Sequence, residues 1–130
     1  MRDGVSVGPG RAVPGDAVLV SGPVGDHGIA VMAAREGIDF ETTLVSDSAP
    51  VVALVRALLD AVPDAHVLRD PTRGGLATAL CEIALSSSVG IRLEEAEIPV
   101  REEVRGACEL LGFDPLYVAC EGRFLAILPD

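Results

Sequence analysis

Hydrophobic residues fall into short apolar runs that alternate with stretches in which they recur three and four positions apart. The second spacing is typical of helices, and short runs rich in Val, Leu and Ile are typical of buried strands. The expected helices are Ile29–Glu36, Val51–Ala61, Gly75–Ser87 and Val100–Leu111, and the expected strands are Ala17–Ser21, Ala65–Leu68 and Phe124–Leu128. This alternation predicts an α/β (α+β) fold in which helices flank a mixed sheet.

Some local features allow weaker predictions. Phe40–Val45 is expected to be extended, and Gly90–Leu93 to be a short strand. Asp26 is a suitable N-cap for the helix that follows it. Cys81 and Cys108 fall on apolar faces of predicted helices, so we expect both to be core residues.

Composition and charge exclude several classes of function. The chain has 130 residues, enough for one domain, and a net charge of −10 with no Lys among its ten basic residues. It has no basic stripe for nucleic acid, no Walker-type lysine, no apolar run long enough to span a membrane and no signal peptide. Its three Cys are widely spaced, so neither a disulfide framework nor a metal site is expected. We therefore expect a cytoplasmic protein.

The stretch Arg69–Gly75 is predicted to be a turn between a strand and a helix. Pro71 disfavours helix before it, and Gly74 and Gly75 allow backbone conformations closed to other residues. Free N–H groups at the start of the following helix, with Arg73 beside them, could hold an anionic group. The alternative is a tight turn in which Asp70 or Thr72 satisfies backbone donors.

Two further features could carry chemistry. Gly22–Gly28 is a second glycine-rich loop between a strand and a helix, although it matches no standard nucleotide motif. In it, His27 is either a proton shuttle or a loop histidine with an ordinary hydrogen bond. Glu121 lies between two apolar segments, so it is either tied to Arg123 or to a backbone cap, or it faces a cleft.

Taken together, five motifs resemble the family of the hydrogenase maturation factor HypE. They are Ser21–Gly28, Ser46–Pro50, Arg69–Gly75, Ile98–Val104 and Asp114–Gly122. The resemblance runs from about Gly15 to the end of the chain, with the motifs in the same order. That family belongs to the superfamily of aminoimidazole ribonucleotide synthetase and selenophosphate synthetase.

The resemblance implies a fold and an activity. Residues 15–130 would be most of a C-terminal domain like that of aminoimidazole ribonucleotide synthetase, and residues 1–14 the join to an absent N-terminal ATP-binding half. The full-length family uses ATP to dehydrate a carbamoylated cysteine in its C-terminal tail to a thiocyanate, which supplies the cyanide ligand of the [NiFe] hydrogenase iron. ATP and Mg2+ would be bound mainly by the absent half, and this chain alone would bind neither tightly and be inactive.

The same resemblance implies partners and site residues. The expected partners are the carbamoyltransferase HypF and the HypC–HypD scaffold, with a homodimer in the full-length family. Glu121 would be the catalytic base, with His27 as the other candidate, and the cofactor-binding residues would be Asp70, Arg73, Gly74 and Gly75. Cys120 departs from the pattern, where Asn is expected, which puts a local hydrogen bond in doubt. Two alternatives remain: an enzyme like selenophosphate synthetase, and a non-catalytic protein-interaction domain.

Overall fold

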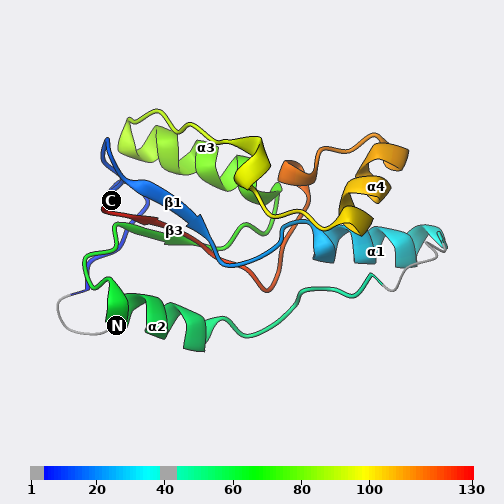
Figure 1. Ribbon diagram of the computed structural model, residues 1–130, viewed down its shortest axis with the longest axis horizontal. Helices are drawn as coiled ribbons and strands as arrows, with labels where there is room; N and C mark the ends of the chain where they lie inside the picture. Colours follow the sequence, from blue (N-terminus) through cyan, green and yellow to red (C-terminus); the bar gives the residue numbers. More distant parts are fainter. Residues whose placement is uncertain (1–4, 39–43) are drawn as a thin grey trace.

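A three-stranded sheet lies between helices in the computed structural model, which describes residues 5–38 and 44–130 (Figure 1). The elements in chain order are β1 (Ala17–Val20), α1 (Asp26–Glu36), α2 (Val52–Ala61), β2 (Val67–Arg69), α3 (Gly75–Ser87), η1 (Glu95–Glu97), α4 (Glu102–Leu111), η2 (Pro115–Tyr117) and β3 (Leu125–Leu128), where η1 and η2 are single-turn 3-10 helices. Helix α3 lies above the sheet in Figure 1 and α2 lies below it. The predicted α/β class is confirmed.

Strand β3 is the centre of the sheet, because the strand order is β1-β3-β2 and both neighbours pair with β3 antiparallel. Ala17 lies opposite Leu128 in one pair, and Val67 lies opposite Ile127 in the other. The expected mixed sheet is therefore corrected to an antiparallel one in the described part of the chain. Strands β1 and β2 do run in the same direction, but the last strand of the sequence inserts between them.

Both faces of β3 are buried. Leu125 and Ile127 share an apolar cluster with residues of α3, whereas Ala126 and Leu128 share one with residues of α2. Successive side chains of a strand point to opposite faces, so a strand covered on both sides needs a continuous apolar run. Leu125–Leu128 is such a run, and all four of its residues are buried.

A second, smaller core joins α1 to α4, which lie side by side beyond one end of the sheet (Figure 1). Its buried residues are Ile29, Val104, Ala107, Cys108 and Val118. Three of the five motifs, Ser21–Gly28, Ile98–Val104 and Asp114–Gly122, lie in segments that lead into or out of α1 and α4. Val100, just before α4, packs against both cores, so the entrance of α4 lies at their junction.

Two helices begin at residues other than those expected. Helix α1 begins at Asp26, and Gly25, with φ 91°, is its N-cap, so the prediction that Asp26 caps this helix is wrong. Helix α4 begins at Glu102 because the residues before it are extended, and the Pro99 carbonyl accepts the Val24 N–H at 2.9 Å. That hydrogen bond ties the entrance of α4 to the loop before α1.

Two further expectations need correction. Gly90–Leu93 forms no strand, and η2 occupies part of the apolar segment before Cys120. Cys108 is buried as predicted, but Cys81 is exposed. It follows the buried Leu80 on α3, and one residue rotates about 100° around a helix axis, which turns Cys81 away from the sheet. Within Phe40–Val45, residues 40–43 lie outside the described residues.

A hydrogen bond between two side chains joins the segment before β1 to the segment before β2. His66 Nδ1 lies 2.8 Å from Asp16 Oδ2, which also accepts the Val13 N–H at 2.8 Å. Burial acts to raise the pKa of Asp16, but the hydrogen bonds from His66 and Val13 outweigh it, and the pKa lies below its ordinary value of 3.8. The ionised carboxylate is therefore the form that the fold stabilises.

We predict that Asp16→Asn lowers the free energy of unfolding by about 1–2 kcal/mol at neutral pH, the scale of a hydrogen bond to a charged group. A lowered pKa contributes stability above the ordinary value of 3.8, and this contribution is lost as the pH falls through the folded-state value. The difference between the two proteins should therefore vanish in acid, as measured by urea unfolding at a series of pH values. Asp64→Asn, at an exposed position nearby, is the control and should change little. A difference that does not shrink as the pH falls below 3.8 would contradict the prediction.

Candidate functional site

The turn between β2 and α3 has the geometry predicted for a strand-to-helix turn. Pro71 is buried, and its carbonyl accepts the Cys120 N–H at 3.1 Å, which fixes the turn to the segment just before Glu121. Gly74 is the N-cap of α3, with φ 77°. A side chain there would be strained and would collide with Thr78, so the sequence needs glycine at this position.

A pocket of about 730 Å3 opens beside this turn. Four of the predicted site residues, Asp70, Arg73, Gly74 and Glu121, line it together. Arg69 and Glu82 also line the pocket and form an ion pair with each other. Arg73 is exposed and has no acidic partner among the described residues, so its guanidinium is available to an anionic group.

Gly75, also predicted to bind a cofactor, does not line this pocket. It is buried with φ 65°, and its N–H donates to the Thr72 carbonyl at 3.2 Å. A Cβ at this position would lie 2.5 Å from the Leu116 carbonyl oxygen and 2.7 Å from that of Val118. Gly75 therefore lets α3 approach the segment that leads to Glu121.

Glu121 is exposed and lines the pocket, in agreement with the expectation that it faces a cleft. Its backbone N–H donates to Asp47 Oδ1 at 3.2 Å. Gly122 follows it and lies so close to the backbone of Asp47 that any side chain would overlap the Asp47 carbonyl. Arg123 pairs with other acids, so the alternative of a Glu121–Arg123 tie is not seen in the described residues.

His27 lies apart from the other predicted site residues. It is half-buried, and its Nδ1 lies 2.8 Å from Ser46 Oγ, which also accepts the Ser48 N–H at 3.1 Å. It does not line the pocket of Glu121. The structure thus gives His27 an ordinary hydrogen bond between two motif loops.

Arg123 is a central residue that the sequence did not single out. Its Nε donates to the Pro23 carbonyl at 3.0 Å, and its Nη1 donates to the Gly122 carbonyl at 3.1 Å. Its guanidinium also lies 3.9 Å from Asp26 Oδ2 and 3.7 Å from Asp47 Oδ2. One half-buried cation therefore joins three motif loops, and a basic residue directly after the Glu-Gly pair was the available signal.

The two carboxylates beside Arg123 are deeply buried, with Asp26 2% and Asp47 8% exposed. Arg101 approaches Asp26 from the entrance of α4, its Nε 3.1 Å from Asp26 Oδ2. Burial raises the pKa of Asp26 above its ordinary value, against the opposing effect of Arg101. Asp26 Oδ1 and Asp47 Oδ2 have no hydrogen-bond partner among the described residues.

Cys120 occupies the position where the resemblance led us to expect Asn. Its Sγ is fully buried and accepts the Gly25 N–H at 3.3 Å, so a local hydrogen bond is present. Burial raises the pKa of the Cys120 thiol from 9.0 to about 11. A thiol that stays protonated at neutral pH is a poor nucleophile, so Cys120 has a packing role.

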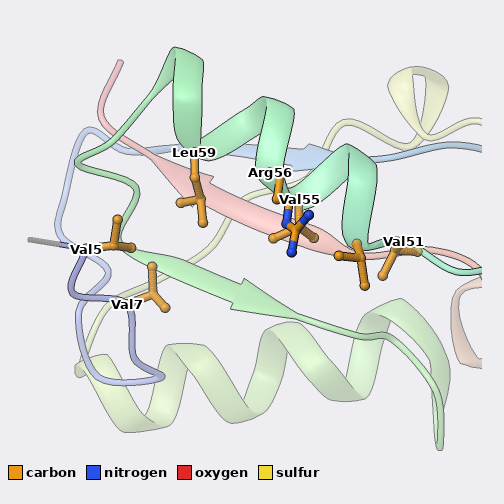
Figure 2. Close-up of a pocket in the computed structure, with 7 residues that line it drawn as sticks. Val5, Val7, Val51, Val55, Arg56 and Leu59 are labelled. Carbon is orange, nitrogen blue, oxygen red and sulfur yellow. The ribbon is translucent and has the colours of Figure 1, made fainter. Parts of the chain in front are cut away.

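Another pocket is apolar and contains none of the predicted site residues. It has a volume of about 650 Å3 and lies between the N-terminal segment and α2, where Figure 2 shows Val5 and Val7 opposite Val55 and Leu59. Arg56 is its sole charged lining residue within the described chain. Without an acid or a nucleophile, this pocket offers no catalytic group.

The described residues contain neither a metal-binding cluster nor a membrane-spanning helix. No three His, Cys, Asp or Glu side chains are grouped closely enough to hold a metal ion. None of the helices in residues 5–38 and 44–130 has the length and apolar character required to cross a membrane. The polar groups that line the pocket of Glu121 are arginines, carboxylates, hydroxyls and backbone groups.

Comparison with known proteins identifies the family. The model of the AIR synthase related protein, C-terminal domain, matches residues 13–130. The chain belongs to this family. The carbamoyl dehydratase HypE of Azotobacter vinelandii is 53% identical over 126 residues, which cover 97% of this chain and 37% of that protein.

Solved structures agree with this relationship. The HypE–HypF complex superposes with a TM-score of 0.94 at 47% identity, over 97% of this chain and 41% of the compared one. HypE in complex with ATP gives a TM-score of 0.91 at 50% identity, over 95% of this chain and 37% of the other. The family assigned from the five motifs is thus confirmed. The chain spans little more than a third of the length of these relatives.

We predict that glycine and arginine in the turn between β2 and α3 respond differently to substitution. Gly75→Ala should lower the free energy of unfolding by about 1–3 kcal/mol, because it forces positive φ on a residue with a Cβ facing two carbonyl oxygens. Arg73→Ala should change it by less than about 0.5 kcal/mol, since the side chain is exposed. Chemical denaturation of both variants tests this. If Arg73→Ala is the more destabilising variant, Arg73 is structural and the anion-site hypothesis fails.

Proposed function

We propose that this domain is the C-terminal part of an ATP-dependent carbamoyl dehydratase of the HypE type, which supplies the cyanide ligand of the [NiFe] hydrogenase iron. The relatives named in the comparison favour this over a selenophosphate synthetase-like enzyme or an interaction domain. The observation that carries the proposal is that Arg73 and Glu121, from two separate motifs, line one pocket. A cation and a carboxylate are the groups that the reaction requires.

The proposed reaction converts a cysteine thiocarboxamide, R–S–C(=O)–NH2, into a thiocyanate, R–S–C≡N. The carbonyl oxygen first accepts the terminal phosphoryl group of ATP. The C–O bond then breaks, and this oxygen leaves as part of inorganic phosphate. The nitrogen loses two protons and forms the C≡N bond, while ATP becomes ADP. Phosphorylation makes a poor leaving group into a good one, which is why the dehydration consumes ATP.

Each residue of the pocket has a proposed role in this reaction. Arg73 stabilises the negative charge on the oxygens of the phosphoryl group during its transfer, as cationic groups do in phosphoryl transfer. Glu121 takes a proton from the nitrogen as the general base. Asp70 and Gly74 shape the turn that holds the phosphate, and Gly75 supports it from behind. His27 is the other candidate for the base. It ranks after Glu121 because it does not line this pocket.

Other parts of the proposal concern groups outside this domain. ATP would be bound mainly by a second domain of the full-length protein, and the described residues offer no three-ligand cluster that would fit Mg2+. The solved complex of a relative with HypF favours HypF as the partner that carbamoylates the cysteine. Delivery to a HypC–HypD scaffold and homodimer formation are proposed on the family resemblance.

Glu121→Gln in the full-length protein tests the role of the base. The substitution keeps the size of the side chain but removes a strong proton acceptor, so we expect dehydration of the thiocarboxamide to fall by about 10²–10⁴. ATP binding and the melting temperature should not change, because Glu121 is exposed and its fixed contact is made by its backbone. Single-turnover formation of thiocyanate, followed by mass spectrometry of the tail peptide, is the measurement.

A matched control is Glu36→Gln, at an exposed acid on the last turn of α1. It should leave thiocyanate formation at the level of the unmodified protein. Unchanged dehydration in Glu121→Gln would transfer the role of base to His27 or to another domain. Loss of ATP binding in parallel with dehydration would instead make Glu121 a nucleotide-binding residue.

A further inference from the structure

Hydrogen bonds to two other motif segments hold the backbone at Glu121. The N–H of Cys120, just before it, donates to the Pro71 carbonyl at 3.1 Å, which ties this segment to the turn of Arg73. The N–H of Glu121 itself donates to Asp47 Oδ1 at 3.2 Å. The side chain of Asp47 is fully buried, and it does not line the pocket of Glu121. A group outside the pocket therefore fixes the backbone of a residue that lines it.

The side chain of Glu121 has no anchor of its own. It is exposed, and it forms no hydrogen bond or ion pair within residues 5–38 and 44–130. The place of its carboxylate is therefore set by the backbone from which the side chain extends. Among the described residues, Asp47 is the one whose side chain binds this backbone at Glu121 itself.

Close packing joins the same two segments at the next residue, Gly122. A Cβ at Gly122 would overlap the carbonyl of Asp47 and would lie 2.9 Å from the backbone nitrogen of Ala49. Glycine has no Cβ, so the two backbones can touch here. The hydrogen bond between Glu121 and Asp47 is thus accompanied by direct backbone contact, which limits how far the two segments can move relative to each other.

Asp47 is itself held from two directions. Its Oδ2 lies 3.7 Å from Arg123 Nε, which faces it from the Glu121 loop. Ser46, the residue before it, has its Oγ 2.8 Å from His27 Nδ1, and this Oγ also accepts the Ser48 N–H at 3.1 Å. A residue can fix another only if its own conformation is fixed, and these contacts meet that condition for Asp47.

We propose that Asp47 is the positioning residue of Glu121, which holds the Glu121 backbone so that its carboxylate faces the pocket of Arg73. This inference rests on the proposed function, in which Glu121 takes a proton from the nitrogen of the thiocarboxamide. A general base must lie within hydrogen-bond reach of the proton that it removes, and a displacement of about 1 Å can lower a rate by about a hundredfold. Asp47 acts without contacting the substrate, because its side chain is fully buried.

The test is a double-mutant cycle in the carbamoylated full-length protein. The measurement is the single-turnover rate of thiocyanate formation at saturating ATP, at a temperature below the melting temperature of every variant. Asp47→Ala should lower this rate by about ten- to hundredfold. In the Glu121→Gln protein, the same substitution should change the rate by less than about twofold, because residues that act as a unit are not additive. A role in folding alone would lower the rate equally in both backgrounds.

Further variants identify the atom that is responsible. Asp47→Asn keeps a carbonyl oxygen that can accept the Glu121 N–H, so its rate should stay within about threefold of the unmodified protein. Asp47→Ser has no atom at the position of Oδ1, so it should lose as much as Asp47→Ala, and it replaces that variant if Asp47→Ala fails to fold. The matched control is Asp16→Ala, which removes another carboxylate that accepts a backbone N–H but lies outside the pocket. It should leave the rate unchanged.

Failure of this inference and failure of the proposed function give different results. If Glu121→Gln alone leaves the rate unchanged, Glu121 is not the base, and the proposed function fails at that step. If Glu121→Gln lowers the rate but Asp47→Ala acts equally in both backgrounds, or has no effect, Asp47 is not a positioning residue. Equal losses in Asp47→Asn and Asp47→Ala would also overturn the inference, because the charge beside Arg123 would then matter rather than the hydrogen bond to Glu121.

Discussion

The junction of the two cores depends on one constraint: the guanidinium of Arg123 lies between two buried carboxylates. Asp26 and Asp47 come from loops far apart in the sequence, and Arg123 also binds the carbonyls of Pro23 and Gly122. Removal of one partner from a buried charge network leaves an uncompensated charge and is strongly destabilising. The loop that carries Glu121 therefore has its place because the buried charges beneath it are balanced.

Local sequence was enough to predict most of the helices and part of the site. Apolar spacing located the four helices, and Pro71 with Gly74 and Gly75 identified the turn where Arg73 lies. These features depend on residues close in the chain, where propensity and turn chemistry act directly. The family resemblance named Arg73 and Glu121 as site residues, but that they line one pocket is seen only in the folded chain.

The features that were not predicted depend on long-range contacts. The insertion of β3 between β1 and β2 is decided by which helices cover its two faces, and its own sequence does not contain that information. Cys81 was misplaced by a single helical position, because an apolar stretch does not say which side faces the sheet. The pairing of Arg123 with Asp26 and Asp47 likewise joins segments that only the folded chain brings together.

The different burial of the three cysteines has a practical consequence. Cys81 is exposed, whereas Cys108 and Cys120 are buried, and burial raises the pKa of both of these thiols. A reagent that attacks thiolates can thus attach a fluorophore or spin label to α3 of the native domain at one defined point. The slower modification of Cys108 and Cys120 would then report how often the α1–α4 core and the Arg123 junction open to solvent. The native cysteines thereby provide both a site for a probe and an internal measure of local unfolding.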